Sequence, residues 1–211
     1  MLIYQLYGAQ GSGSAIVEIA LECCQVPYRT LEAAPWEDSP GLAALARLNP
    51  LKQIPTLQLP DGSILTESAA ILIELGLRYP DSGLLPEDGG ARAQAIRGLV
   101  YIAANCYSAI GVIDYPERWL RGADEPLQAR VRETARERLH RSWEIFADQF
   151  AAQLCASSTT LAALDFHAAV VSRWAGSREH LRRERPEFCA LLERIDRHPQ
   201  VAQVLARHWP V

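Results

Sequence analysis

The sequence predicts an α/β domain followed by an all-α, helical-bundle domain. Three observations favour this fold class: all predicted strands fall before residue 66, turn-forming residues cluster at 79–90, and Ala, Leu, Arg and Glu dominate from residue 91 onward. The alternation of strands and helices indicates a small mixed sheet with helices on both faces. We therefore expect domains at 1–79 and 91–211, joined by a linker at 80–90.

The composition argues against several classes of function. The chain has 211 residues, 49% of them hydrophobic, so it can bury a core, and its net charge of −4 disfavours nucleic acid as a partner. It has no basic leader before an apolar run and no stretch of about 18 uninterrupted apolar residues, so we expect a soluble, cytoplasmic protein without a membrane partner. The five Cys and five His residues lack metal-site spacing, so no metal is expected. We expect Cys23 and Cys24 to be packed rather than redox-active.

The first part of the α/β domain predicts a βαβ unit. A β-branched and aromatic run at 2–7 ends at Gly8, apolar residues recur at helical spacing over 13–24, and a second strand is expected at 27–31. A strand, a helix and a strand within about 30 residues predict parallel pairing through a right-handed crossover.

The second part predicts a helix and then a hairpin that leads into another helix. Asn49–Pro50 stops the first helix, and Asp61–Gly62 suits the hairpin turn. We expect the helix, the two strands and the final helix at 41–47, 56–59, 63–65 and 67–78. The buried side of the final helix is expected to contain Ile71, Leu72, Leu75 and Leu77.

Helices alone are expected beyond residue 90. The predicted helices lie at 91–121, 126–155, 162–175, 186–196 and 199–207. Pro126, Pro186 and Pro199 suit the first turns of three of them. Asp165 occupies the acidic position of a capping box, but Ala162 stands where the hydroxyl belongs, so this helix start should be weaker by about 1 kcal/mol.

One segment combines features that suit a small zwitterionic peptide. Pro55 begins a predicted strand, and a cis Ile54–Pro55 bond would turn the backbone groups of Ile54 outward to pair with a ligand. Glu67 and Ser68 open a helix whose free N–H groups attract a carboxylate, while the Glu67 side chain can accept from an ammonium group. Each feature has a simpler reading, a trans proline at a strand edge and an ordinary helix cap. Their combination favours a binding site.

These motifs resemble those of soluble, bacterial-like glutathione S-transferases. The most specific run is Asn49–Pro55, which is similar to theta-, zeta- and beta-like members of the family. The resemblance implies a thioredoxin-like N-terminal domain, a helical C-terminal domain, and glutathione as co-substrate. It also implies that Ile54, preceding Pro55, pairs with the cysteinyl backbone. By the same resemblance Lys52 and Gln53 lie near the glycyl end, and Glu67 and Ser68 hold the γ-glutamyl end.

The residue that stabilises the glutathione thiolate is expected in the loop before or at the start of the first helix. The catalytic cysteine of beta-like members corresponds to Gly13, which has no side chain, so a cysteine mechanism is excluded there. Ser12 is the first candidate, Ser14 the second, and Tyr7 at the strand end the third. Both serines can instead be plain N-caps, and backbone N–H groups of the loop can also stabilise a thiolate.

The predicted function is transfer of glutathione to a hydrophobic electrophile. The electrophile is expected between the domains, near Tyr101, Asn105, Tyr107, Ser108 and Trp119, although ordinary bundle packing also explains each of these. The alternatives are a non-catalytic glutathione-binding or regulatory protein, and a glutathione-dependent isomerase or peroxidase. The resemblance further implies a homodimer.

Overall fold

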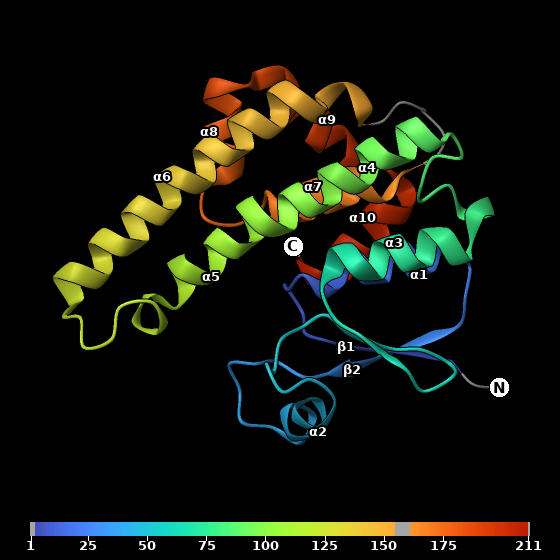
Figure 1. Cartoon of the computed structure of the whole chain (residues 1–211), viewed down its shortest axis with the longest axis horizontal. Coiled ribbons are helices and arrows are strands. Elements are labelled where there is room, and N and C mark those ends of the chain that lie inside the picture. The colour runs from blue at the N-terminus through green and yellow to red at the C-terminus, as the bar shows by residue number, and fades with distance from the viewer. Residues whose placement is uncertain (1–2, 155–160, 211) are drawn as a thin grey trace.

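The computed structural model describes residues 3–154 and 161–210 (Figure 1). Its first elements are β1 (Tyr4–Gly8), α1 (Ser14–Cys23), β2 (Tyr28–Glu32), α2 (Pro40–Leu48), β3 (Thr56–Gln58), β4 (Ile64–Leu65) and α3 (Ser68–Arg78). After a short 3₁₀ turn, η1 (Pro80–Ser82), the described residues are helical: α4 (Gly89–Tyr101), the π-helical turn η2 (Ile102–Tyr107), α5 (Ser108–Asp114), the 3₁₀ turn η3 (Pro116–Arg118), α6 (Glu125–Phe150), the 3₁₀ turn η4 (Ala151–Gln153), α7 (Ala163–Val171), α8 (Ser177–Glu184), α9 (Pro186–Asp196) and α10 (Pro199–His208). The predicted fold class is confirmed: a thioredoxin-like α/β domain precedes an all-helical domain.

The sheet brings three chain segments to one end. Its strand order is β2-β1-β3-β4, with β1 parallel to β2 and antiparallel to β3, and β3 antiparallel to β4. Antiparallel pairing therefore places the end of β1, the beginning of β3 and the end of β4 at the same end of the sheet. Tyr7 lies opposite Thr56, so Pro55 lies beside the loop that follows Gly8.

Helices cover both faces of the sheet, as the sequence predicts. In Figure 1, α1 and α3 lie above the strands and α2 lies below them. Tyr7, Ala33 and Leu45 form a small apolar cluster between the sheet and α2. A second, larger core begins at Tyr4 and Leu6 and extends through α1. This larger core continues into α7 and α9, so one apolar interior joins the two domains.

Several sequence expectations about the helices are wrong. The long helix predicted at 91–121 ends at Asp114, because Pro116 disfavours helical geometry at Tyr115, whose φ is −131° and ψ 59°. Leu77, predicted to be buried, is 57% exposed, because it lies two residues beyond buried Leu75 and so points away from that face. The helix predicted at 126–155 begins at Glu125 and ends at Phe150, where the 3₁₀ turn η4 follows, and residue 155 lies outside the described residues. The helix predicted at 162–175 ends at Val171, before Ala175 and Gly176, whose φ angles of 56° and 74° do not fit a right-handed helix.

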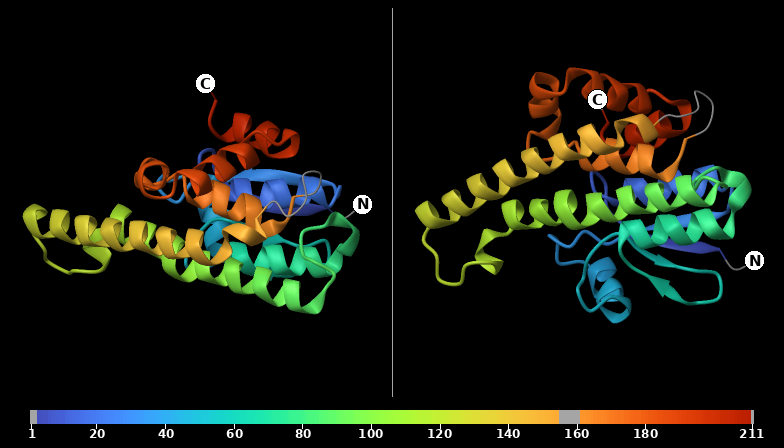
Figure 2. Two further views of the ribbon diagram at one scale, coloured as in Figure 1. Left: turned by 90° about the horizontal axis from the view of Figure 1, so that it is seen from above. Right: turned by 45° about the horizontal axis from the view of Figure 1, so that its top comes forward.

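The helical domain is built around a long helical run and its partner. Figure 2 shows α5 and α6 side by side, with their connecting loop far from the sheet. The run Gly89–Asp114 is long and apolar enough to cross a membrane by length and composition. The sequence expectation considered only uninterrupted apolar runs and missed it. Because Leu99, Ile102 and Cys106 lie in the core, we interpret this run as a core helix of the domain.

Candidate functional site

The loop after β1 is held by a compact hydrogen-bond network. The Ser12 hydroxyl donates to the Ala9 carbonyl at 2.7 Å and lies 2.8 Å from the Ser14 hydroxyl. Ser14 donates to the same carbonyl at 3.2 Å, and its backbone N–H donates to Ser12 Oγ at 3.2 Å. Ser12 is 7% exposed and Ser14 is fully buried. The N-cap of α1 is Gly13, which has no side chain, so neither serine is the N-cap itself.

The predicted strand-edge proline lies beside this loop. The Ile54–Pro55 peptide bond is cis, as the combined motifs suggest. Among the described residues, the backbone N–H and C=O groups of Ile54 make no hydrogen bond. Lys52 and Gln53 are exposed next to it, and Lys52 has a positive φ of 53°. This segment therefore offers an unpaired backbone edge at the end of the sheet.

Asn49 holds this segment in place, a role that the sequence reasoning missed. The buried Asn49 amide donates to the Gln53 carbonyl at 3.1 Å and to Thr56 Oγ1 at 3.0 Å. The Thr56 hydroxyl donates to the same Gln53 carbonyl at 2.8 Å. In the sequence, Asn49 stands out only as a helix stop before Pro50 and as the first residue of the Asn49–Pro55 run, and neither feature indicates this bracing role.

The beginning of α3 completes the site. Glu67 is exposed, has a positive φ of 63°, and makes no side-chain cap hydrogen bond. The first N–H groups of a helix have no partner within it, so α3 presents free donors beside the end of β4. Ser68, the first residue of α3, is 5% exposed, and its hydroxyl oxygen lies 3.3 Å from Nε2 of His167 in α7.

A tyrosine from the helical domain reaches the loop. A Cβ atom built on Gly13 would overlap the Tyr107 hydroxyl, so this phenol occupies the position a side chain would need. The Tyr107 ring stacks on Trp174, with centroids 5.8 Å apart and planes inclined by 10°. Burial, assisted by the Asp114 carboxylate, raises the pKa of Tyr107 to about 12, so the hydroxyl remains a hydrogen-bond donor at neutral pH.

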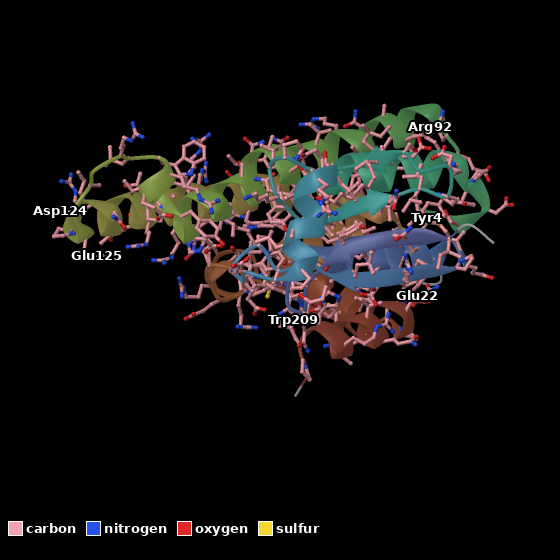
Figure 3. All side chains as sticks on the ribbon, turned by 90° about the horizontal axis from the view of Figure 1, so that it is seen from below. Tyr4, Glu22, Arg92, Asp124, Glu125 and Trp209 are labelled. Atoms are coloured by element: carbon pink, nitrogen blue, oxygen red, sulfur yellow. The ribbon has the colours of Figure 1, made fainter. Side chains whose placement is uncertain are left out.

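The C-terminal helix closes the other side of the loop. The Trp209 indole nitrogen would lie 3.8 Å from a Cβ atom on Gly11, and its ring leans on Trp174 with centroids 6.2 Å apart. In Figure 3, Tyr4 marks the end of the sheet where β1 begins. Trp209 lies at the opposite end, where β1 finishes. Tyr107, Trp174 and Trp209 therefore form a connected aromatic surface over the Gly11–Ser14 loop.

The other residues predicted to line the space between the domains point elsewhere. The Tyr101 hydroxyl donates to the Ser142 carbonyl, and Asn105 and Ser108 bond to carbonyls of their own helix. Trp119 is 65% exposed beyond α5. Tyr7 packs in the small cluster between the sheet and α2, so its side chain is directed away from α1. Among these candidates, Tyr107 is the residue in contact with the loop.

Cys23 and Cys24, at the end of α1, do not supply a reactive thiolate. Burial raises the pKa of Cys23 to about 12 and that of Cys24 to about 11, so both remain thiols at neutral pH. Within the described ranges, no three His, Cys, Asp or Glu side chains lie together as metal ligands.

Comparisons with known proteins bear on the family and the fold. The family model of the glutathione S-transferase N-terminal domain matches residues 14–77. The chain is 32% identical over 207 residues to the uncharacterized GST-like protein YncG of Escherichia coli K12, covering 97% of this chain and 98% of YncG. It is 28% identical over 160 residues to the glutathione S-transferase GstA of Escherichia coli O157:H7, covering 75% of each. A glutathione transferase homologue from Sulfitobacter, solved with bound glutathione, has the same fold, with a TM-score of 0.78, 22% identity and 97% of each chain covered.

Proposed function

Because the chain belongs to the glutathione S-transferase superfamily, we propose that it binds glutathione at the end of the sheet where β1, β3 and β4 converge. Ile54, held next to Pro55, pairs through its backbone with the cysteinyl residue. Lys52 and Gln53 lie near the glycyl carboxylate. Glu67 accepts from the γ-glutamyl ammonium group, while Ser68 and the free N–H groups of α3 hold its carboxylate. The observation that carries the proposal is that one end of the sheet joins an unpaired backbone edge to an uncapped helix N-terminus.

We further propose that the bound thiol is used as a nucleophile. The thiol proton leaves to solvent, and the sulfur then forms a bond to an electrophilic carbon as the leaving group departs with its electron pair. The aromatic surface at Tyr107, Trp174 and Trp209 suits a flat, hydrophobic electrophile. The positive end of α1 stabilises the thiolate.

Ser12 is the proposed hydroxyl donor to the thiolate. Its hydroxyl now donates to the Ala9 carbonyl, but Ser14 donates to the same oxygen. The Ser12 hydrogen can therefore turn to a bound sulfur without leaving that buried carbonyl unpaired. The neutral Tyr107 hydroxyl over Gly13 is a second donor from the opposite side.

Calorimetry followed by a turnover assay tests the proposal. We expect glutathione to bind with a dissociation constant in the millimolar range or tighter, and a chloronitrobenzene to be conjugated. In Ser12→Ala, the pKa of the bound thiol, read from thiolate absorbance, should rise by about one unit, which lowers the thiolate fraction about tenfold. Ser63→Ala, in the exposed turn of the hairpin, is the control. Absence of glutathione binding would refute both the binding and the transferase proposals.

A non-catalytic glutathione-binding or regulatory role is the second candidate function. The missing side chain at Gly13 and the internal bonding of Ser12 favour it. Glutathione binding without turnover, equal in wild type and Ser12→Ala, would establish this alternative. Turnover with an isomerisable or peroxide substrate, but not with an aryl halide, would indicate an isomerase or a peroxidase.

We also propose a cytoplasmic homodimer. The family resemblance supports it, and Leu77 of α3 and Val100 of α4 expose apolar side chains on helices that pack against each other. The cytosol holds a reduced glutathione pool. Sedimentation equilibrium should give about twice 23.4 kDa. Leu77→Glu and Val100→Glu should shift the mass toward one chain, whereas Leu127→Glu on α6 should not.

A further inference from the structure

A histidine from the helical domain lies directly behind the proposed γ-glutamyl site. His167, on α7, is fully buried, and its Nε2 atom lies 3.3 Å from the hydroxyl oxygen of Ser68. Its other ring nitrogen, Nδ1, has no hydrogen-bond partner among the described residues. Burial lowers the pKa of His167 to about 3, so the imidazole is neutral at physiological pH and carries one ring hydrogen.

The unpaired nitrogen decides which ring atom carries that hydrogen. With the hydrogen on Nδ1, a buried N–H donor would have no acceptor, which is among the costlier arrangements in a protein interior. With the hydrogen on Nε2, the N–H donates to Ser68 Oγ, and only a lone pair on Nδ1 remains unpaired. The second tautomer is therefore the favoured one.

This tautomer fixes the role of the serine. Ser68 Oγ accepts from His167, so its own hydrogen is not used in that bond, and no acceptor for it is found among the described residues. Ser68 is buried at the first position of α3, where Glu67 provides no cap. A hydroxyl hydrogen and the free N–H groups of the same helix end then act together on one anionic group.

We propose that His167 is a positioning residue that orients the Ser68 hydroxyl toward the α-carboxylate of the γ-glutamyl residue. The inference rests on the proposed glutathione site and extends it across the domain interface. In the opposite arrangement, Ser68 would donate to His167 and lose its donor for the ligand. The helical domain thus contributes to glutathione recognition without touching glutathione.

A double-mutant cycle measured by calorimetry tests this role. His167→Leu should weaken glutathione binding about tenfold, the effect expected for one hydrogen bond to a charged group. His167→Leu added to Ser68→Ala should cause no further loss. His167→Gln, which keeps an amide donor, should retain most of the affinity. Additive losses in the cycle would overturn the proposal, because a purely structural histidine weakens binding whether or not Ser68 is present.

Two glutathione analogues locate the effect on the ligand. γ-Aminobutyryl-cysteinylglycine lacks the α-carboxylate and should bind wild type and His167→Leu equally well. Glutaryl-cysteinylglycine keeps the carboxylate but lacks the amino group, and its binding should fall by the same factor as that of glutathione. An equal loss with both analogues would overturn the proposal.

The tautomer can be measured on the wild-type chain, so this test does not require a variant to fold. Nitrogen-15 chemical shifts should show the hydrogen of His167 on Nε2. A hydrogen on Nδ1 would overturn the proposal while leaving glutathione binding itself intact. If wild type fails to bind glutathione, the proposed function falls together with this inference. If wild type binds glutathione and the losses in the double-mutant cycle are additive, only the proposed role of His167 is refuted.

Discussion

Gly13 is a residue whose lack of a side chain has a structural reason as well as a catalytic consequence. A Cβ atom there would overlap the Tyr107 hydroxyl. We expect Gly13→Ala to lower the free energy of unfolding by about 1–3 kcal/mol, the usual effect of overpacking a closely packed site. Tyr107→Phe should restore part of the loss in the double variant, because it removes the overlapping oxygen. Urea denaturation measures each step.

Gly111 is the matched control for this substitution. It lies inside α5, and a Cβ atom there would meet nothing within 4 Å. Gly111→Ala should therefore stabilise the chain by about 0.5–1 kcal/mol through helix propensity. A stabilising Gly13→Ala would contradict the close approach of Tyr107.

His167 also makes a pH prediction at the residue scale. Its pKa is about 3 in the folded chain, below the ordinary value of 6.5, because burial disfavours the charged ring. The unfolded chain takes up this proton below about pH 6.5, whereas the folded chain does not do so until about pH 3. Stability contributed by the neutral ring is thus complete above about pH 6.5 and is lost as the pH falls, by at most about 1.4 kcal/mol per unit.

Urea midpoints between pH 5 and pH 7 measure this loss. The slope of wild type should exceed that of His167→Gln, because glutamine does not titrate. The carboxylates and the other histidines change stability in the same way in both chains, so the difference between the two chains isolates His167. Parallel curves over this range would show that the ring is not held neutral.

At the scale of elements, the start of α7 gives a stabilising prediction. Asp165 accepts from the Ala162 N–H at 2.9 Å, but alanine has no side-chain oxygen to return the bond, as the sequence indicates. Ala162→Ser should complete the capping box and raise the free energy of unfolding by about 1 kcal/mol. Ala162→Val, which adds bulk without an acceptor, should give no gain. Equal midpoints for Ala162→Ser and wild type in urea would contradict the prediction.

Elements whose ends depend on local chemistry could be predicted from the sequence. Pro186 and Pro199 begin α9 and α10 as expected, because a proline at the first turn needs no hydrogen bond there. The same residue type ends α5 earlier than its apolar pattern predicts, because Pro116 disfavours helical geometry at Tyr115. Leu77 was expected to be buried because it is apolar. Its position two residues after buried Leu75 places it on the exposed side of α3 instead.

At the scale of the whole molecule, local sequence patterns indicate only the part of the candidate site that lies in the first domain. The parallel pairing of β1 with β2 and the hairpin of β3 with β4 follow from local patterns. The antiparallel pairing of β1 with β3, which brings the Ile54 edge beside the loop, does not. The contacts of Tyr107 with Gly13 and of His167 with Ser68 join residues 94 and 99 positions apart, across the domain interface. No local pattern encodes how the domains dock. Tyr107 was expected between the domains, but neither its contact with Gly13 nor that of His167 with Ser68 has a local signal in the sequence.

The docking also predicts how the molecule unfolds. Glu18 of α1 is buried, and it accepts from His208 Nε2 at 2.9 Å and from Arg207 Nε at 2.8 Å, both at the end of α10. Burial alone would raise the pKa of Glu18, but these hydrogen bonds outweigh it and hold the pKa below its usual value. Glu18→Ala leaves the buried His208 without this partner, so the free energy of unfolding should fall by about 2–3 kcal/mol.

This decrease in the free energy of unfolding should apply to both domains, because one apolar core extends from Leu6 through α1 to α7. Hydrogen exchange should therefore show the same decrease for amides of β1 and of α7. Glu22→Ala is the control, since Glu22 bonds Arg207 at the surface, where an ion pair contributes about 0–1 kcal/mol. A decrease confined to α10 would mean that the C-terminal helix opens alone and that the two domains do not unfold as one unit.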